Sequence, residues 1–150
     1  MATMVGKPVF LDTNVLIYAG RPESVQHDAA LAALKRLEME GCSFWISSQV
    51  LREYLAVVTR PQSMIPALPM AEAIADVRRF MDLFDIAEDR PTILDRLLRI
   101  VTAYPTAGKQ SHDAHLVATM VDYGINRLLT FNRRDFERFA SFIRLEATNH

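Results

Sequence analysis

Short apolar runs alternate with longer segments of helical spacing along this chain of 150 residues, and this alternation restricts the possible folds. Runs typical of β-strands lie near residues 8–11, 44–46, 86–87, 128–130 and 142–145. Strands that are connected through helices pair in parallel, and both faces of such a sheet must be covered. The sequence therefore predicts an α/β fold, a three-layer α/β/α sandwich with a mainly parallel central sheet.

The predicted helices cover residues 14–19, 24–40, 50–58, 71–84, 93–101 and 112–123, with a short one inside 132–139. Gly41 stands where a helix C-terminal cap belongs, Ser47 or Ser48 can cap the next helix, and Ser111 is a candidate N-cap. Residues 60–69 (RPQSMIPALP) contain three prolines and are predicted to be a loop. No internal repeat is visible, so we expect residues 1–150 to form a single domain.

The composition gives few indications of a partner or compartment. The formal net charge is −1, and Cys42, the sole cysteine, allows no intramolecular disulfide; we expect it to pack at a strand edge. The first ten residues lack the apolar core of a signal peptide, and no apolar run approaches the roughly 20 residues of a membrane span. We expect a soluble, cytoplasmic protein with no membrane partner.

Three acidic residues stand in apolar surroundings. Asp12 directly follows the first strand, Glu53 lies on the helix after the second, and Asp113 falls in the first turn of a later helix. Right-handed crossovers bring the carboxyl ends of parallel strands to one edge of the sheet, where ligands bind. Converging carboxylates repel one another unless a cation is bound. The sequence therefore suggests a site for a hard divalent cation, Mg²⁺ or Mn²⁺.

Each acid also has a plainer explanation. Asp12 is a possible helix cap, Glu53 a possible ion-pair partner of Arg52, and Asp113 a first-turn acid that favours the helix dipole. If the three do share a pocket, the rest of the chain has 15 acidic against 17 basic residues, a balance compatible with a phosphate-bearing substrate.

Four segments together resemble a PIN domain: FLDTNVLIY at the start, a glutamate after the second strand, HDAHLVA, and LLTFNRRDF. The short length and GKQSHDAHLVATM are most similar to VapC-type toxins of toxin–antitoxin systems. This resemblance implies a Mg²⁺- or Mn²⁺-dependent endoribonuclease that cuts RNA, with tRNA or rRNA as the expected substrate. It also implies a cognate antitoxin and a homodimer.

The metal chemistry assigns roles to the three acids. Asp12 and Asp113 are expected to be direct metal ligands, while Glu53 binds through water or orients the attacking water. Thr13 and Asn14 are expected to hydrogen-bond the loop and steer Asp12. Zinc is disfavoured, because His112 and His115 have no cysteine or third histidine near them in the sequence.

The fourth position departs from the family, where a carboxylate often follows the strand; here Asn132 supplies an uncharged amide. We expect Asn132 to support the site through its carbonyl oxygen. Asp135 either completes the site or caps the short helix, so the number of metals stays open. Arg133, Arg134 and Arg138 form a basic cluster that is suited to phosphate or is simply solvated.

Two other functions remain alternatives. A PIN-like module that binds RNA or a partner without cleavage is compatible with the missing fourth acid. A phosphohydrolase would need a second aspartate two residues after the first, and position 14 is Asn. In the proline-rich connection, apolar Met64, Ile65, Leu68 and Met70 are candidates for an antitoxin or dimer contact, or for core packing.

Overall fold

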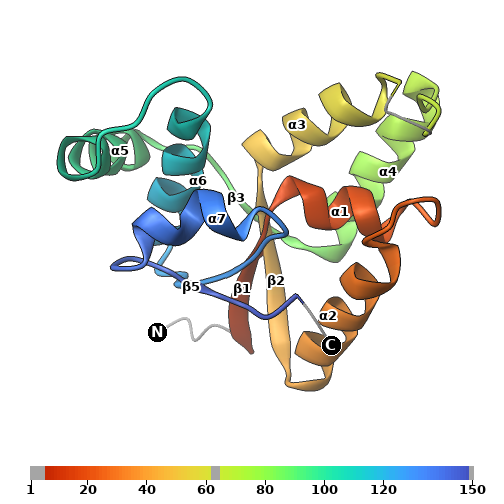
Figure 1. Cartoon of the computed structure of the whole chain (residues 1–150), viewed down its shortest axis with the longest axis horizontal. Coiled ribbons are helices and arrows are strands. Elements are labelled where there is room, and N and C mark those ends of the chain that lie inside the picture. The colour runs from red at the N-terminus through yellow and green to blue at the C-terminus, as the bar shows by residue number, and fades with distance from the viewer. Residues whose placement is uncertain (1–5, 62–64, 149–150) are drawn as a thin grey trace.

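The computed structural model describes residues 6–61 and 65–148 and shows helices packed on both sides of a sheet (Figure 1). The five strands are β1 (Lys7–Leu11), β2 (Cys42–Ser47), β3 (Asp85–Ala87), β4 (Arg127–Leu129) and β5 (Arg144–Leu145). Their order is β3-β2-β1-β4-β5, and every neighbouring pair is parallel. The predicted fold class is confirmed.

The helices divide between the two sides of the sheet. They are α1 (Thr13–Ala19), α2 (His27–Met39), α3 (Ser48–Val58), α4 (Met70–Leu83), α5 (Pro91–Ala103), α6 (Gln110–Asp122) and α7 (Arg133–Phe136), followed by a 3-10 turn, η1 (Glu137–Phe139). Figure 1 shows α1 to α4 to the right of the sheet, and α5, α6 and α7 to its left. Within the described part of the chain, no helix is long and apolar enough to cross a membrane.

The strand order reverses its direction between β1 and β4. From β1 the chain continues outward to β2 and β3, and it then returns to the other side of β1 to form β4 and β5. Connections that leave two adjacent strands in opposite directions open a space beyond the carboxyl ends of those strands. Asp12 follows β1 and Thr130 follows β4, so both residues lie at the point where the strand order reverses.

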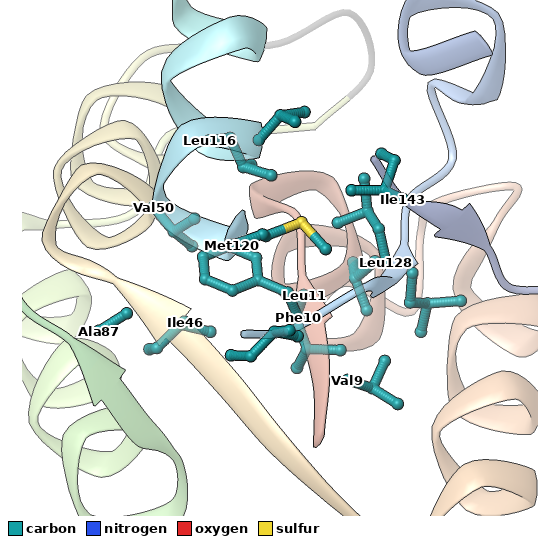
Figure 2. Close-up of a cluster of buried hydrophobic side chains, with 14 of the residues drawn as sticks. Val9, Phe10, Leu11, Ile46, Val50, Ala87, Leu116, Met120, Leu128 and Ile143 are labelled. Atoms are coloured by element: carbon teal, nitrogen blue, oxygen red, sulfur yellow. The ribbon is translucent and has the colours of Figure 1, made fainter. Parts of the chain in front are cut away.

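The central position of β1 in the sheet explains why its last three residues are apolar. Val9, Phe10 and Leu11 are completely buried, which is expected for a strand that is covered on both faces. Figure 2 shows these side chains among Leu116 and Met120 of α6, together with Ile46, Leu128 and other buried apolar residues. This packing holds β1 and α6 in fixed relative positions.

Several element boundaries differ from the prediction. The helix expected from Ser24 begins at His27, because Ser24 instead forms a turn in which its Oγ accepts from the Gln26 amide at 3.2 Å. Ser47, rather than Ser48, caps α3 by accepting from the Val50 amide at 3.3 Å.

Ser111 is not the N-cap of α6, so this prediction was wrong. The helix already begins at Gln110, and the cap position belongs to Lys109, which makes no side-chain cap bond. The chain turns earlier because Gly108 adopts a φ of 57°, a conformation that glycine tolerates. Asp113 nevertheless lies in the first turn, as expected.

The proline-rich connection contributes to the core only in part. Leu68 packs against the core, whereas Met70 is 53% exposed and Ile65 is half-buried; Met64 lies outside the described residues. The buried guanidinium of Arg21 donates to the carbonyls of Val58 (3.4 Å) and Pro66 (3.1 Å) and so ties this connection to the end of α1.

A buried ion pair closes the β4–β5 edge of the sheet. Arg127 Nε and Nη2 donate to the two carboxylate oxygens of Glu146 at 3.0 and 2.9 Å, and the two side chains are only 12% and 8% exposed. The guanidinium lowers the pKa of Glu146 by hydrogen bonding to the carboxylate. Arg127 also contacts Cys42 Sγ at 3.4 Å, which places the partly buried cysteine beside the start of β4.

Replacement of Glu146 with alanine should lower the free energy of unfolding by about 3 kcal/mol at pH 7, because it leaves the buried Arg127 charge unpaired. Urea denaturation measures this loss. Glu40→Ala is the control: its partner Arg36 and Glu40 itself are 43% and 44% exposed, so the expected loss is below about 1 kcal/mol. Equal losses of unfolding free energy in the two variants would contradict a stabilising, buried Arg127–Glu146 ion pair.

Candidate active site

Asp12, a candidate site residue, lies at the carboxyl end of β1 and caps helix α1. Its amide donates to the Leu129 carbonyl at 3.0 Å, which extends the β1–β4 pairing by one residue. Oδ1 accepts from the Thr13 amide at 2.8 Å, and Oδ2 accepts from Thr130 Oγ1 at 2.7 Å and Asn14 Nδ2 at 3.1 Å. The side chain is only 7% exposed. Three donors therefore orient a nearly buried carboxylate.

The loop after β4 is fixed to the same position. Asn14 Oδ1 accepts from the Phe131 amide at 3.1 Å, and Thr130 Oγ1 accepts from the Asn132 amide at 3.0 Å. Asn14 therefore steers both Asp12 and the neighbouring loop, as predicted. Sequence reasoning missed the role of Thr130, although its place at the end of the strand beside β1 was a usable signal.

Glu53 faces the same edge from α3. Its Oε2 accepts from Thr13 Oγ1 at 2.8 Å, and its Oε1 accepts from Gln49 Nε2 at 2.9 Å. Among the described residues Glu53 has no ion pair with Arg52, which is exposed. Gln49 was also missed from the sequence; its position four residues before Glu53 places the two side chains on one helix face.

Asp113 is half-buried in the first turn of α6, and other acids act on it. Burial has the largest effect and raises its pKa to about 7, with further increases from the charges of Asp12, Asp135 and Glu53. Arg138 opposes this increase. The structure thus brings the other three predicted acidic residues within electrostatic reach of Asp113.

The pKa of Asp12 is also raised. Burial raises the pKa of Asp12 to about 6, hydrogen bonds from Thr130 and Thr13 lower it, and the charge of Glu53 raises it. Near neutral pH, therefore, the fully ionised set of acids is electrostatically unfavourable without a positive charge. A bound cation would relieve this repulsion.

The residues fit a hard cation that keeps part of its water shell. The described residues contain no group of three or more His, Cys, Asp or Glu side chains arranged to enclose a metal ion. Mg²⁺ is, however, commonly bound through one or two carboxylates plus water. Asp12 and Asp113 are two oxygen donors whose pKa values are raised first by burial and further by neighbouring negative charge. They match that requirement.

Asn132 and Asp135, the two candidates for the fourth position, differ in their place relative to α7. Asn132 is exposed and precedes α7 without capping it through its side chain. Asp135 lies in the first turn of α7, and its charge raises the pKa of Asp113. Of the basic cluster, Arg133 donates to the Glu146 carbonyl, whereas Arg134 and Arg138 are exposed.

The two histidines of α6 are engaged by Gln49. The His112 carbonyl accepts from Gln49 Nε2 at 3.1 Å, and His115 Nδ1 bonds Gln49 Oε1. His115 Nε2 lies 3.7 Å from Asp89 Oδ1. Both histidines are therefore linked to Glu53 through hydrogen bonds with Gln49.

The metal-free protein should become less stable as pH rises from about 4 to 7. The folded-state pKa values of Asp12 and Asp113, about 6 and about 7, exceed the ordinary value of 3.8, so the folded state binds more protons in this window and ionisation opposes folding. Asp113→Asn should reduce this decline and be more stable than the wild type at pH 8. Chemical denaturation in chelator across pH 5–8 measures both effects.

Asp95→Asn is the matched control, since Asp95 is an exposed acid on α5. It should keep the wild-type pH dependence. A wild-type protein that gains stability from pH 5 to 8 would contradict the electrostatic description of the site.

Comparison with known proteins agrees with this geometry. The family model for the PIN domain matches residues 9–141. Among curated proteins, none matches this chain in sequence.

Solved structures share the fold at low sequence identity. VapBC2 from Rickettsia felis bound to a promoter DNA fragment has a TM-score of 0.66 and 19% identity, covering 93% of this chain and 97% of that one. VapC20 from Mycobacterium tuberculosis, a toxin that cleaves the sarcin–ricin loop, has a TM-score of 0.66 and 17% identity, covering 91% of this chain and 96% of that one. A toxin–antitoxin complex from Klebsiella pneumoniae has a TM-score of 0.64 and 19% identity, covering 95% of this chain and 98% of that one. With the family match over most of its length, this chain belongs to the PIN-domain family.

Proposed function

We propose that this protein is a Mg²⁺- or Mn²⁺-dependent endoribonuclease and the toxin of a type II toxin–antitoxin pair. The observation that carries the proposal is that Asp12, Glu53 and Asp135 all act electrostatically on Asp113 beside a PIN-domain sheet, where burial and these like charges raise the pKa of Asp113. Such a site suits hydrolysis of a phosphodiester, which requires a cation next to negatively charged oxygens.

Asp12 and Asp113 would hold the cation. When bound, it would acidify a water molecule and offset charge on the phosphate oxygens. Asp12 contributes a carboxylate that three hydrogen-bond donors hold in one orientation. Asp113 contributes a more accessible carboxylate from the neighbouring helix.

Glu53 would orient the attacking water and take its proton. Thr13 and Gln49 each donate to a different oxygen of Glu53, so the carboxylate plane is fixed while lone pairs on both oxygens stay available. Arg134 and Arg138 are exposed beside the site, and guanidinium groups suit the phosphates that flank a cut in RNA.

Asp135 is our candidate for the fourth acid, with Asn132 in a supporting role. The charge of Asp135 acts on Asp113 from the first turn of α7, whereas Asn132, which directly precedes α7, brings an uncharged amide. One firmly held metal, rather than two, is consistent with this weaker fourth position.

The proposed partners follow from the structural relatives. Two of them are toxin–antitoxin assemblies, one bound to promoter DNA. For this chain we propose an antitoxin whose Arg or Lys enters the acidic site and displaces the metal. Exposed apolar side chains on α4, with Met70, Ile74 and Met81 each more than 40% exposed, support a homodimer or antitoxin contact on that helix.

Purified, partner-free protein should cut discrete sites in a pool of tRNA and rRNA when Mg²⁺ or Mn²⁺ is present, and EDTA should stop it. Asp12→Asn and Asp113→Asn should abolish cleavage, and Glu53→Gln should slow it about 100-fold, the usual scale for loss of a general base. Sequencing of the new RNA ends measures the cuts. Asp113 gives a second test because Asp12 is buried and its replacement can disturb folding.

Asp95→Asn, which changes an exposed acid on α5, should retain wild-type cleavage. Folded protein that binds Mn²⁺ but leaves the RNA intact would contradict the proposed nuclease and favour a PIN-like binding module. Cleavage that persists in both aspartate variants would show that the activity comes from elsewhere.

A further inference from the structure

Gln49 is buried at the start of α3, where it contacts Glu53 and two residues of α6. The side chain is 7% exposed. Its Nε2 donates to Glu53 Oε1 at 2.9 Å and to the His112 carbonyl at 3.1 Å, while its Oε1 bonds His115 Nδ1. Every polar atom of this amide therefore has a partner that lies beside the proposed site.

The orientation of the amide follows from its neighbours. Glu53 and the His112 carbonyl are both acceptors, so the Gln49 NH₂ group must face them, and its two hydrogens are then both used. The reversed amide would place its oxygen against two other oxygens. Gln49 Oε1 must consequently accept a hydrogen bond from His115, which fixes the His115 proton on Nδ1.

The contacts with α6 lie on both sides of Asp113 in the sequence. The His112 carbonyl directly precedes Asp113, and His115 follows it by two residues. Figure 1 shows α3 and α6 standing above opposite sides of the sheet, so this amide bridges the two helices across the site. The same amide holds Glu53 four residues along α3.

We propose that Gln49 is a positioning residue that sets the orientation of Glu53 and its separation from Asp113, and thereby the metal affinity and turnover of the site. The inference rests on the proposed nuclease function. Gln49 itself is not a catalytic residue: it acts through Glu53 and the first turn of α6. Thr13 restrains the other oxygen of Glu53, so the carboxylate depends on both donors for a single orientation.

The test is Gln49→Met, which keeps the side-chain length and removes all three hydrogen bonds. Calorimetry with Mn²⁺ alone should show a dissociation constant about tenfold higher than that of the wild type, the usual scale for loss of a group that orients metal ligands. On the RNA that the wild type cuts, kcat should fall while KM stays unchanged. Gln110→Met is the matched control: Gln110 also lies near Asp113 on α6, but its Oε1 accepts from the Ala107 amide.

A spectroscopic readout separates positioning from general stability. In ¹⁵N NMR spectra at pH 8.5, wild-type His115 should carry its proton on Nδ1, and Gln49→Met should lose this preference. Gln49→Glu gives a second test, because it can still accept from His115 but cannot donate to Glu53; it should keep the Nδ1 proton and still lose kcat.

The outcomes are distinguishable. Wild-type Mn²⁺ affinity and kcat in folded Gln49→Met, or a wild-type His115 with its proton on Nε2, would overturn the inference and leave the proposed nuclease intact. A wild-type protein that neither binds Mn²⁺ nor cuts RNA would overturn both. A tenfold weaker affinity in Gln49→Met, with an unchanged Gln110→Met, would support the inference.

Discussion

Repulsion among carboxylates at one edge of the sheet is the constraint around which this structure is organised. Asp12, Glu53 and Asp113 come from three different elements, and burial together with like charge raises the pKa of Asp12 to about 6 and of Asp113 to about 7. A fold that served stability alone would gain from replacing such a set with neutral residues. The cation that we propose for this site would offset the repulsion among these carboxylates.

The fold keeps these charges in place through neutral donors. Thr130 and Asn14 hold Asp12 at the junction of β1 and β4, and Thr13 and Gln49 hold Glu53 on α3. The apolar residues Val9, Phe10 and Leu11 of β1 fix this junction because they are fully buried and β1 lies between β2 and β4 (Figure 2). Strand order, buried core and polar donors therefore act together: the strand order brings β1 and β4 side by side, the buried core holds them in place, and the polar donors orient the acids.

The sequence predicted the strand and helix order because its apolar runs are clearly separated, and it predicted Asp12, Glu53 and Asp113 as a group because acids in apolar surroundings are conspicuous. It did not reveal Gln49, an uncharged residue whose partners, His112 and His115, are more than sixty positions away. It also misplaced the start of α6, since the turn at Gly108 rather than the hydroxyl of Ser111 decides where the helix begins. Long-range polar contacts and glycine conformations are properties of the folded chain that local patterns do not contain.

The most direct measurement is an anomalous-difference map from crystals of the partner-free protein grown with Mn²⁺. The account predicts a peak at the carboxyl edge of β1 and β4, coordinated by the carboxylates of Asp12 and Asp113 and otherwise by water. A map without a peak at this edge, in crystals with both acids ionised and Mn²⁺ in excess, would contradict the central claim that charge repulsion here is relieved by a bound metal.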